Sequence, residues 1–281
     1  MRDAVAADLA ALDGVEVEMC QGNDAQLARA AQLADAALVI APETGGVLHR
    51  LCRMVEDVGG VLLGPSSAAV QLTADKWRLA EHLAVNGVRT PPCRSAGVND
   101  WSYPQVCKPR DGAGSQATFL VECADNWINC IDQARREDFE GEPLAQPYVP
   151  GVPASASFLI GPDKTLPLPP TRQVLSNDGR FHYLGSVADL PALQARRAAA
   201  CGLQAVRAIE GLRGYVGVDL VLGQAADGNQ DYVIEINPRL TSSYLELRRI
   251  MRENLMGLML KLLKVSHDNA RTTCLCPSAA E

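Results

Sequence analysis

The most informative part of this chain reads Asp219-Leu-Val-Leu222 and, a short way on, Tyr232-Val-Ile-Glu-Ile-Asn-Pro-Arg239. We treat the two segments as antiparallel strands in which Leu222 pairs with Tyr232, because side chains along a strand alternate between the faces of a sheet. This register places Asp219 opposite Glu235 and sorts the apolar residues of both strands onto one face. The sequence therefore predicts a sheet with one face in a core and one polar face.

The polar face of these strands carries Asp219, Glu235 and Asn237, whose oxygens are the hard ligands that Mg2+ prefers. Two neighbouring carboxylates also repel each other unless a cation lies between them. Arg239 follows on the same side, where it could hold an anion. A solvated sheet face would explain Asp219 alone, whereas the whole set favours a site for Mg2+, with Mn2+ as the alternative ion.

A second segment, Val106-Cys-Lys-Pro-Arg-Asp-Gly-Ala-Gly-Ser-Gln116, predicts a phosphate-binding loop. A short apolar strand ends in Lys108 and enters a glycine-rich turn, where backbone amides can approach phosphate oxygens closely. No lysine follows the last glycine, so the pattern differs from the Walker motif. Residues 117–121 predict a returning strand, which makes the segment a hairpin loop. Ordinary turn chemistry explains the glycines equally well when the segment is considered alone.

The motifs around these segments come in a specific order. Asp75-Lys76 opens a helix, a Lys-Pro pair precedes the glycine loop, and Gln146-Pro-Tyr-Val-Pro-Gly151 forms a hinge before the next strand. A Val-Asp-Leu strand followed by Glu-Ile-Asn-Pro-Arg completes the series. In this order and spacing the motifs resemble the ATP-grasp family over residues 60–265.

The resemblance implies a role for each matching residue. Lys76 and Lys108 would contact the phosphates of ATP, and Arg239, with Lys108, would act on the transferred phosphoryl group. Gln146 would lie at the edge of the adenine. The complete ATP site would consist of Lys76, Lys108, Gly112, Ala113, Gly114, Ser115, Gln146, Pro147, Tyr148 and Val149. The metal ligands would be Asp219, Glu235 and Asn237.

The resemblance also implies an activity, an ATP-dependent ligase that forms an amide. ATP would phosphorylate a carboxylate to give an acyl phosphate, and an amine would then displace the phosphate. Such chemistry needs mainly charge neutralisation in a closed site. A phosphotransferase built on the same clamp, or another amino-acid ligase, remains the alternative. A catalytically inactive nucleotide-binding regulator is disfavoured, because the lysines, the metal ligands and the arginine are all present.

Three short segments narrow the choice of substrates. Thr241, Ser242 and Ser243 place hydroxyls at a helix start, Arg172 follows two prolines, and Glu43 lies in a loop after a strand. A helix cap would explain the hydroxyls, and a capping carboxylate would explain Glu43. Together the segments resemble the tyramine–glutamate ligase group, which serves the assembly of methanofuran-type one-carbon carriers. The resemblance implies L-glutamate and tyramine, or tyrosine, as substrates.

The composition restricts the classes of partner. The chain has 281 residues, 47% of them hydrophobic, and a formal net charge of -7, which argues against nucleic acid as the main partner. No apolar run is long enough to span a membrane, and no signal peptide precedes the first helix. Nine cysteines without a CxxC pair indicate free thiols. We expect a cytoplasmic protein that binds small molecules, either alone or as a homodimer.

The order of expected elements indicates an α/β protein, an α+β clamp with the ATP-grasp fold. We expect a small parallel α/β domain over residues 1–70, an ATP-grasp domain over 71–265 and a flexible tail over 266–281. Within the ATP-grasp domain, 71–150 would form the ATP-binding lobe with the glycine loop. Residues 151–265 would form the metal and substrate lobe.

The small domain alternates strands and helices, which predicts a parallel sheet. Its strands are expected at Val15–Met19, Ala36–Ala41 and Val61–Leu63. The chain begins on a helix, whereas members of the resembled family usually begin with a strand, so this sheet is expected to lack its first strand. Later in the chain, Asp189 is expected to cap a helix, and Tyr244–Leu263 to form a helical stretch whose methionines fill the core.

Overall fold

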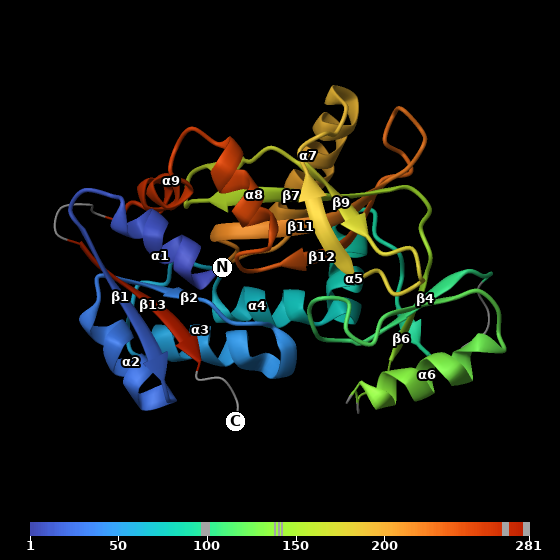
Figure 1. The fold of residues 1–281 in the computed structure, drawn as a ribbon, viewed down its shortest axis with the longest axis horizontal. Helices are drawn as coiled ribbons and strands as arrows, with labels where there is room; N and C mark the ends of the chain where they lie inside the picture. Colours follow the sequence, from blue (N-terminus) through green and yellow to red (C-terminus); the bar gives the residue numbers. More distant parts are fainter. Residues whose placement is uncertain (97–101, 138, 140, 142, 266–269, 278–281) are drawn as a thin grey trace.

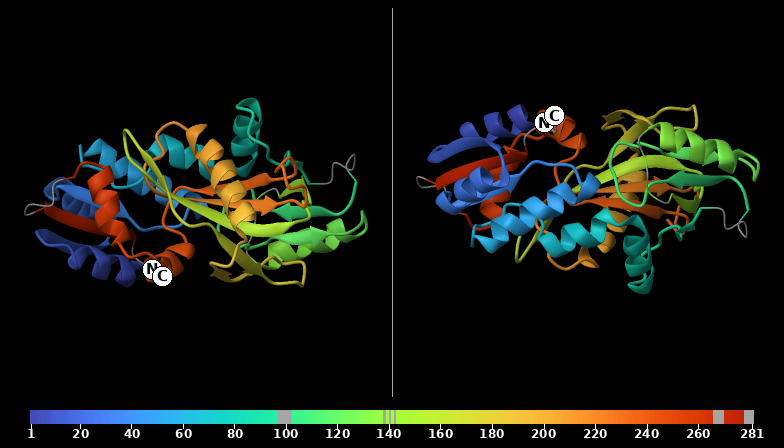
Figure 2. Two further views of the ribbon diagram at one scale, coloured as in Figure 1. Left: turned by 90° about the horizontal axis from the view of Figure 1, so that it is seen from above. Right: turned by 90° about the horizontal axis from the view of Figure 1, so that it is seen from below.

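The structure, a computed structural model, describes residues 1–96, 102–137, 139, 141, 143–265 and 270–277. Within these residues the strands form three sheets, of three, six and four strands. The sheets follow one another along the longest axis of the molecule (Figure 1), and the two turned views show the same elongated arrangement (Figure 2). The mixed α/β class expected from the sequence is confirmed.

Helices and strands alternate over the first part of the described chain and come in runs after it. The helices are α1 (Arg2–Ala10), α2 (Asp24–Leu33), α3 (Val47–Asp57), α4 (Ser67–Ala74), α5 (Lys76–Val85), α6 (Asn126–Arg136), α7 (Ala192–Arg207), α8 (Ser243–Ile250) and α9 (Leu255–Leu262), with a 3-10 turn η1 (Thr44–Gly46). The strands are β1 (Val15–Gly22), β2 (Ala36–Val39), β3 (Arg94–Ser95), β4 (Gln105–Lys108), β5 (Phe119–Val121), β6 (Leu144–Pro147), β7 (Val152–Ile160), β8 (Thr165–Pro167), β9 (Thr171–Leu175), β10 (Tyr183–Val187), β11 (Gly214–Leu222), β12 (Tyr232–Asn237) and β13 (Ala270–Pro277).

The small N-terminal sheet takes its central strand from the other end of the chain. Strand β13 lies between β1 and β2 and pairs in parallel with both (Figure 1). The prediction of a flexible tail is therefore wrong for Ala270–Pro277, while 266–269 and 278–281 lie outside the described residues. The chain begins on α1 as expected, and β13 completes the sheet. Threonines and cysteines make the segment look polar, but threonine is favoured in strands and cysteine is often buried.

Both faces of the small sheet are covered. Cys274 and Leu275 of β13 are fully buried, as is usual for the central strand of a parallel sheet. Helices α2 and α3 bury residues such as Leu27 and Leu51 in the core with Leu275, whereas Cys274 packs in the core with α1 and α9. The third strand expected in this domain is reduced to a single parallel bridge between Leu62 and Ala37.

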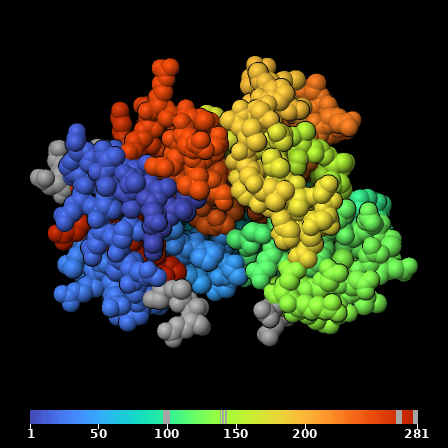
Figure 3. Space-filling view, in the orientation of Figure 1, coloured from blue at the N-terminus to red at the C-terminus, as the bar shows by residue number. Residues whose placement is uncertain are grey.

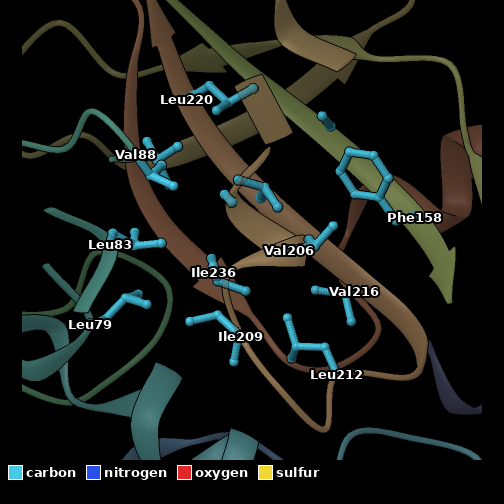
Figure 4. Close-up of a cluster of buried hydrophobic side chains, with 14 of the residues drawn as sticks. Leu79, Leu83, Val88, Phe158, Val206, Ile209, Leu212, Val216, Leu220 and Ile236 are labelled. Carbon is cyan, nitrogen blue, oxygen red and sulfur yellow. The ribbon is translucent and has the colours of Figure 1, made fainter. Parts of the chain in front are cut away.

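The six-stranded sheet runs in the order β10-β9-β7-β11-β12, with β8 beside β7. Its apolar face packs against α5, α7 and the segment that follows α7 (Figure 4). A Cβ at Gly202 would lie 2.9 Å from the ring of Phe158, so glycine permits α7 to approach the sheet closely. The labelled members of this core are Leu79, Leu83, Val88, Phe158, Val206, Ile209, Leu212, Val216, Leu220 and Ile236.

A second core joins the small domain to the C-terminal helices. Tyr244 and Tyr215 lie in it with ring centroids 5.9 Å apart. Met256 and Met259 of α9 are fully buried, which confirms their assignment to the core. Asp8 of α1 accepts hydrogen bonds from the Tyr244 hydroxyl and from Arg248, both in α8, so the N-terminal helix is tied to this core.

Two helix predictions need correction. Helix α7 starts after Pro191, and Asp189 pairs with Arg172 instead of capping the helix. The expected helix from 244 to 263 is divided into α8 and α9. The Asn254 side chain accepts hydrogen bonds from the backbone amides of Met256 and Gly257, and it therefore caps the start of a new helix.

The four-stranded sheet has the order β3-β6-β4-β5. Strands β4 and β5 form the antiparallel hairpin that the glycine-loop pattern predicts. Helix α6 covers the sheet through Trp127, which packs in the same core as Cys107 and Phe119. Lys108 therefore ends an interior strand of this sheet and pairs with Leu144 of β6.

Candidate active site

The register between β11 and β12 determines where the acidic residues lie. Asp219 pairs with Glu235, as the sequence predicts. The predicted pairing of Leu222 with Tyr232 is wrong, because Tyr232 lies opposite Val221. A β-bulge beside Asp219 accounts for the difference of one residue. The acidic pair is therefore kept, although the rest of the assumed ladder shifts.

The bulge changes which residues of β12 enter the core. Val233 is fully buried, whereas Ile234, the extra residue of the bulge, and Tyr232 are partly exposed. Beyond the bulge, Asn237 lies opposite Gly217. Bulges commonly redirect side chains beside functional sites, and this one keeps the polar face next to an apolar core.

Two amide groups hold the Asp219 carboxylate. Asn237 Nδ2 donates to Asp219 Oδ2 at 3.0 Å, and Gln173 Nε2 donates to Asp219 Oδ1 at 2.9 Å. Burial and the neighbouring charge of Glu235 raise the pKa of Asp219 to about 7. With its Nδ2 engaged, Asn237 has its side-chain oxygen left for a cation.

Glu235 lies close to positive charge. Lys76 Nζ is 3.7 Å from Glu235 Oε2 and donates to the Gly112 carbonyl oxygen at 2.8 Å. Burial alone would raise the pKa of Glu235, but the charges of Lys76 and Lys108 outweigh it and hold that pKa below its usual value. The acidic pair and both lysines therefore share one electrostatic environment.

Lys108 is a buried cation with a neutral partner. Its side chain is 5% exposed, and Nζ donates to Gln146 Oε1 at 2.7 Å. Burial lowers the pKa of Lys108. Gln146 in turn donates to the Pro91 carbonyl oxygen at 3.0 Å. The residue expected at the adenine edge thus also holds the side chain of Lys108 in place.

The glycine loop uses backbone conformations that favour glycine. Gly112 and Gly114 have φ of 123° and 74°. Ser115 has φ of 60°, and its Oγ donates to the Phe181 carbonyl oxygen at 2.8 Å. The Phe181 ring stacks on Tyr148 with centroids 6.2 Å apart. The loop therefore lies beside the β9–β10 turn and the hinge.

The start of the loop is tied to two other elements. Arg110 Nε and Nη2 donate to the Asp75 carboxylate at 2.9 and 2.8 Å, and Asp75 caps α5. Asp111 Oδ2 accepts the Gly45 backbone amide of η1 at 3.2 Å. Ala113 follows as a partly exposed residue. The loop thus contacts the small domain as well as the helix that begins with Lys76.

The hinge residues differ in which of their backbone groups are left to bind a ligand. The Tyr148 amide donates to the Pro104 carbonyl oxygen at 3.1 Å. Pro147 ends β6 opposite Gln105, and proline has no amide hydrogen, so only its carbonyl could serve a ligand. Val149 is partly buried next to them.

Arg239 and Glu43 form an ion pair between the segment after β12 and the loop after β2. Arg239 Nε donates to Glu43 Oε2 at 2.5 Å, and its Nη1 donates to the Leu240 carbonyl oxygen at 3.2 Å. Glu43 is 6% exposed although it lies in a loop after β2. The structure brings together two candidate substrate-binding residues that lie 196 positions apart in the sequence.

The hydroxyl residues after Arg239 differ in exposure. Thr241 and Ser243 are buried, whereas Ser242 is exposed. The Tyr215 hydroxyl donates to Ser157 Oγ at 2.7 Å and lies 3.0 Å from Thr241 Oγ1. Ser242 occupies the N-cap of α8 without a side-chain cap bond, so helix capping does not explain its hydroxyl.

The guanidinium of Arg172 forms an ion pair with a carboxylate of this protein. Its Nε and Nη2 donate to the Asp189 carboxylate at 3.0 and 2.5 Å. Its neighbour Gln173 reaches Asp219 instead, a role for which the sequence gives no signal. Alternation along β9 places Gln173 on the sheet face that carries Asp219. The sequence could predict this only if the strand order β9-β7-β11 were known.

The residues at β11 and β12 fit a divalent cation. Two carboxylates and an amide oxygen are hard ligands. Burial and repulsion by Glu235 raise the pKa of Asp219, and a cation between the two carboxylates would relieve the repulsion. In the part of the chain that the structure describes, no group of three His, Cys, Asp or Glu side chains could hold a metal ion. The third protein ligand would therefore be Asn237.

The family of the chain follows from comparison with family models. A model of the ATP-grasp domain matches residues 73–243. The chain belongs to the ATP-grasp family. A model of the pre ATP-grasp 3 domain matches residues 1–70. The family that the ordered motifs predict is confirmed.

One curated relative of this ATP-grasp protein is a tyramine–L-glutamate ligase from Methanocaldococcus fervens. The two are 30% identical over 215 residues, which are 76% of this chain and 62% of the relative. A tyramine–L-glutamate ligase of Methanocaldococcus jannaschii is also 30% identical, over 58% of its length. The chain thus spans about three fifths of the length of these relatives.

Solved structures agree with the fold. An ATP-grasp superfamily protein from Archaeoglobus fulgidus matches with a TM-score of 0.64 at 27% identity, covering 83% of this chain and 67% of that chain. Biotin carboxylase of Campylobacter jejuni, in complex with β,γ-ATP, matches with a TM-score of 0.72 at 17% identity, covering 88% and 60%. The second likeness concerns the fold alone. In the described residues no helix is long and apolar enough to cross a membrane.

Proposed function

We propose that this ATP-grasp protein is an ATP-dependent ligase that joins a carboxylate to an amine. The observation that carries the proposal is the convergence of Lys76, Lys108 and the Asp219–Glu235 pair in one electrostatic environment. Basic groups for phosphate oxygens and acidic groups for a cation therefore lie side by side. Arg239, beyond the end of β12, adds a third basic group on this face.

In this proposal Mg·ATP, or Mn·ATP, is the first substrate. Asp219, Glu235 and Asn237 would hold the metal, whose charge would neutralise phosphate oxygens. Lys76 and Lys108 would contact the phosphates, and the glycine loop would cover them. A carboxylate oxygen of the second substrate would attack the terminal phosphorus and release ADP. The resulting acyl phosphate would react with the amine nitrogen, and phosphate would leave with one carboxylate oxygen.

L-Glutamate and tyramine are the substrates that we propose, with tyrosine as an alternative amine. The support is the likeness to two proteins named tyramine–L-glutamate ligases. Arg239 and the buried hydroxyls of Thr241 and Ser243 would suit a carboxylate, and Glu43 would suit an ammonium group. A place in the assembly of methanofuran-type carriers rests on the sequence resemblance alone.

The proposal is tested by measuring phosphate release from Mg·ATP with L-glutamate, with and without tyramine or tyrosine, while product masses are recorded. We expect release that depends on the amine and a new mass equal to the condensed pair. Release without either amine would contradict the substrates. A phosphate mass added to a hydroxyl compound, with no amide, would identify a phosphotransferase instead.

A further inference from the structure

The Arg239–Glu43 ion pair lies where three parts of the molecule meet. Arg239 follows the metal strand β12, and Glu43 precedes η1 of the small domain. Gly45 of η1 donates its amide to Asp111 of the glycine loop. On the face in Figure 3, the small domain and C-terminal helices, in blue and red, lie on one side and the clamp, in green and yellow, on the other. The ion pair thus connects the small domain to the clamp.

The Glu43 carboxylate occupies an edge of the Arg239 guanidinium that a substrate anion would use. Its Oε2 accepts from Arg239 Nε at 2.5 Å, a geometry that any carboxylate could reproduce. Only 6% of Glu43 is exposed, so water would replace the arginine poorly as its partner. A buried charge that loses its partner is strongly unfavourable. Displacement of Glu43 therefore requires a new cation beside it.

We propose that Glu43 and Arg239 exchange partners during turnover. The carboxylate of the first organic substrate takes the place of Glu43 at Arg239, and the released Glu43 carboxylate binds the ammonium group of the amine substrate. No covalent bond changes in the exchange. This inference rests on the proposed ligase function and adds to it an order of binding, with the carboxylate substrate before the amine.

The exchange makes the two organic substrates cooperative. Before the carboxylate substrate binds, Glu43 is neutralised by Arg239 and attracts an amine only weakly. After it binds, Glu43 is a buried anion that lacks a partner until the ammonium group arrives. Because binding coupling is reciprocal, each substrate should tighten the other. An amine without positive charge should gain nothing from the coupling.

Steady-state kinetics of Glu43→Gln tests the exchange. The variant keeps the shape of the side chain but removes its charge and thereby weakens its competition for Arg239. We expect the KM for tyramine to rise about tenfold or more, since one partner of a buried charge pair is lost, while the KM for L-glutamate stays equal or falls. Glu56→Gln, at a carboxylate that binds Ser67 elsewhere in the small domain, should leave both constants unchanged.

Wild-type binding gives a second readout that does not depend on the variant folding. By calorimetry in the presence of Mg·ADP, tyramine should bind more tightly when L-glutamate is present than when it is absent. Equal tyramine affinity in both conditions would overturn the exchange. So would a parallel rise of both KM values in Glu43→Gln.

The outcomes separate this inference from the function on which it rests. If the wild type forms no amide from any carboxylate and amine offered, the ligase function is overturned and the exchange with it. If the amide forms but the two KM values do not move apart, the ligase stands and the exchange alone is overturned.

Discussion

Lys108 is a cation held almost out of water at the end of an interior strand. Gln146 is the neutral partner of its ammonium, and burial lowers its pKa. A neutral partner compensates a buried charge only partly. The arrangement is therefore best suited to a site where an anion, here proposed to be phosphate, completes the neutralisation.

Replacement of this lysine should be costly. We expect Lys108→Ala to lower kcat/KM by about 100-fold or more, because a positioned charge on the transferred group is removed. The exposed Lys164 offers a matched control, and Lys164→Ala should retain full activity. Amide formation at a near-normal rate by the Lys108 variant would show that the phosphates bind elsewhere.

Gln173 provides a test of how the metal ligands are positioned. Its amide holds one oxygen of Asp219, so Gln173→Leu should weaken the apparent affinity for Mg2+ by roughly 10–100-fold. A titration of activity against Mg2+ concentration measures this. Gln204→Leu, on α7, serves as the control, because it removes an amide that donates to the Gly87 carbonyl oxygen. An unchanged Mg2+ requirement in the Gln173 variant would exclude the positioning role.

The sequence predicts part of the site and leaves the rest open for a physical reason. Alternation along two strands places Asp219 opposite Glu235, because that pattern is local to one hairpin. The contact of Gln173 with Asp219 depends on the order of three strands, and the contact of Glu43 with Arg239 joins two domains. Periodicity carries no information on either arrangement.

Helix α5 is an element whose start belongs to the site. Asp75 caps it through the amides of Trp77 and Arg78 and also binds Arg110 at the root of the glycine loop. Burial opposes ionisation of Asp75, but these hydrogen bonds outweigh it and hold its pKa below the usual value. The cap therefore links helix stability to the position of Lys76.

The Asp75 cap should make stability depend on pH. A carboxyl whose folded pKa is lowered stabilises the protein above its unfolded pKa of about 3.9, and that contribution is lost as pH falls through the folded value. Asp75→Ala should thus cost about 1 kcal/mol of unfolding free energy at pH 7. Urea unfolding of both proteins should show this difference shrinking below about pH 4. A difference that persists or grows in acid would contradict the assignment.

Strand β13 makes the whole molecule depend on its last segment. It supplies the central strand of the small sheet, and its side chains fill the cores on both sides. We expect a chain that ends at residue 265 to lose the cooperative unfolding of the small domain and to bind hydrophobic dyes. A chain that ends at Pro277 keeps β13 and is the control. Thermal unfolding followed by circular dichroism measures both, and identical melting curves would show that β13 is dispensable.

The fold as a whole is predicted best where signals are local. The β4–β5 hairpin and the buried methionines of α9 follow from turn chemistry and apolar spacing. The place of β13 does not, because parallel pairing between opposite ends of a chain leaves no trace in local patterns. The sequence also does not reveal the bulge at Ile234, because this extra residue is apolar like its neighbours in β12.

At this site, we propose, ATP activates a carboxylate before an amine displaces phosphate. The most direct measurement uses L-glutamate in which both carboxylates carry isotopically labelled oxygen, with Mg·ATP and tyramine, and records the mass of the released phosphate. We predict one labelled oxygen in each phosphate, because the acyl phosphate leaves that oxygen on phosphorus. Phosphate without label would mean that water had attacked ATP, and it would contradict the account.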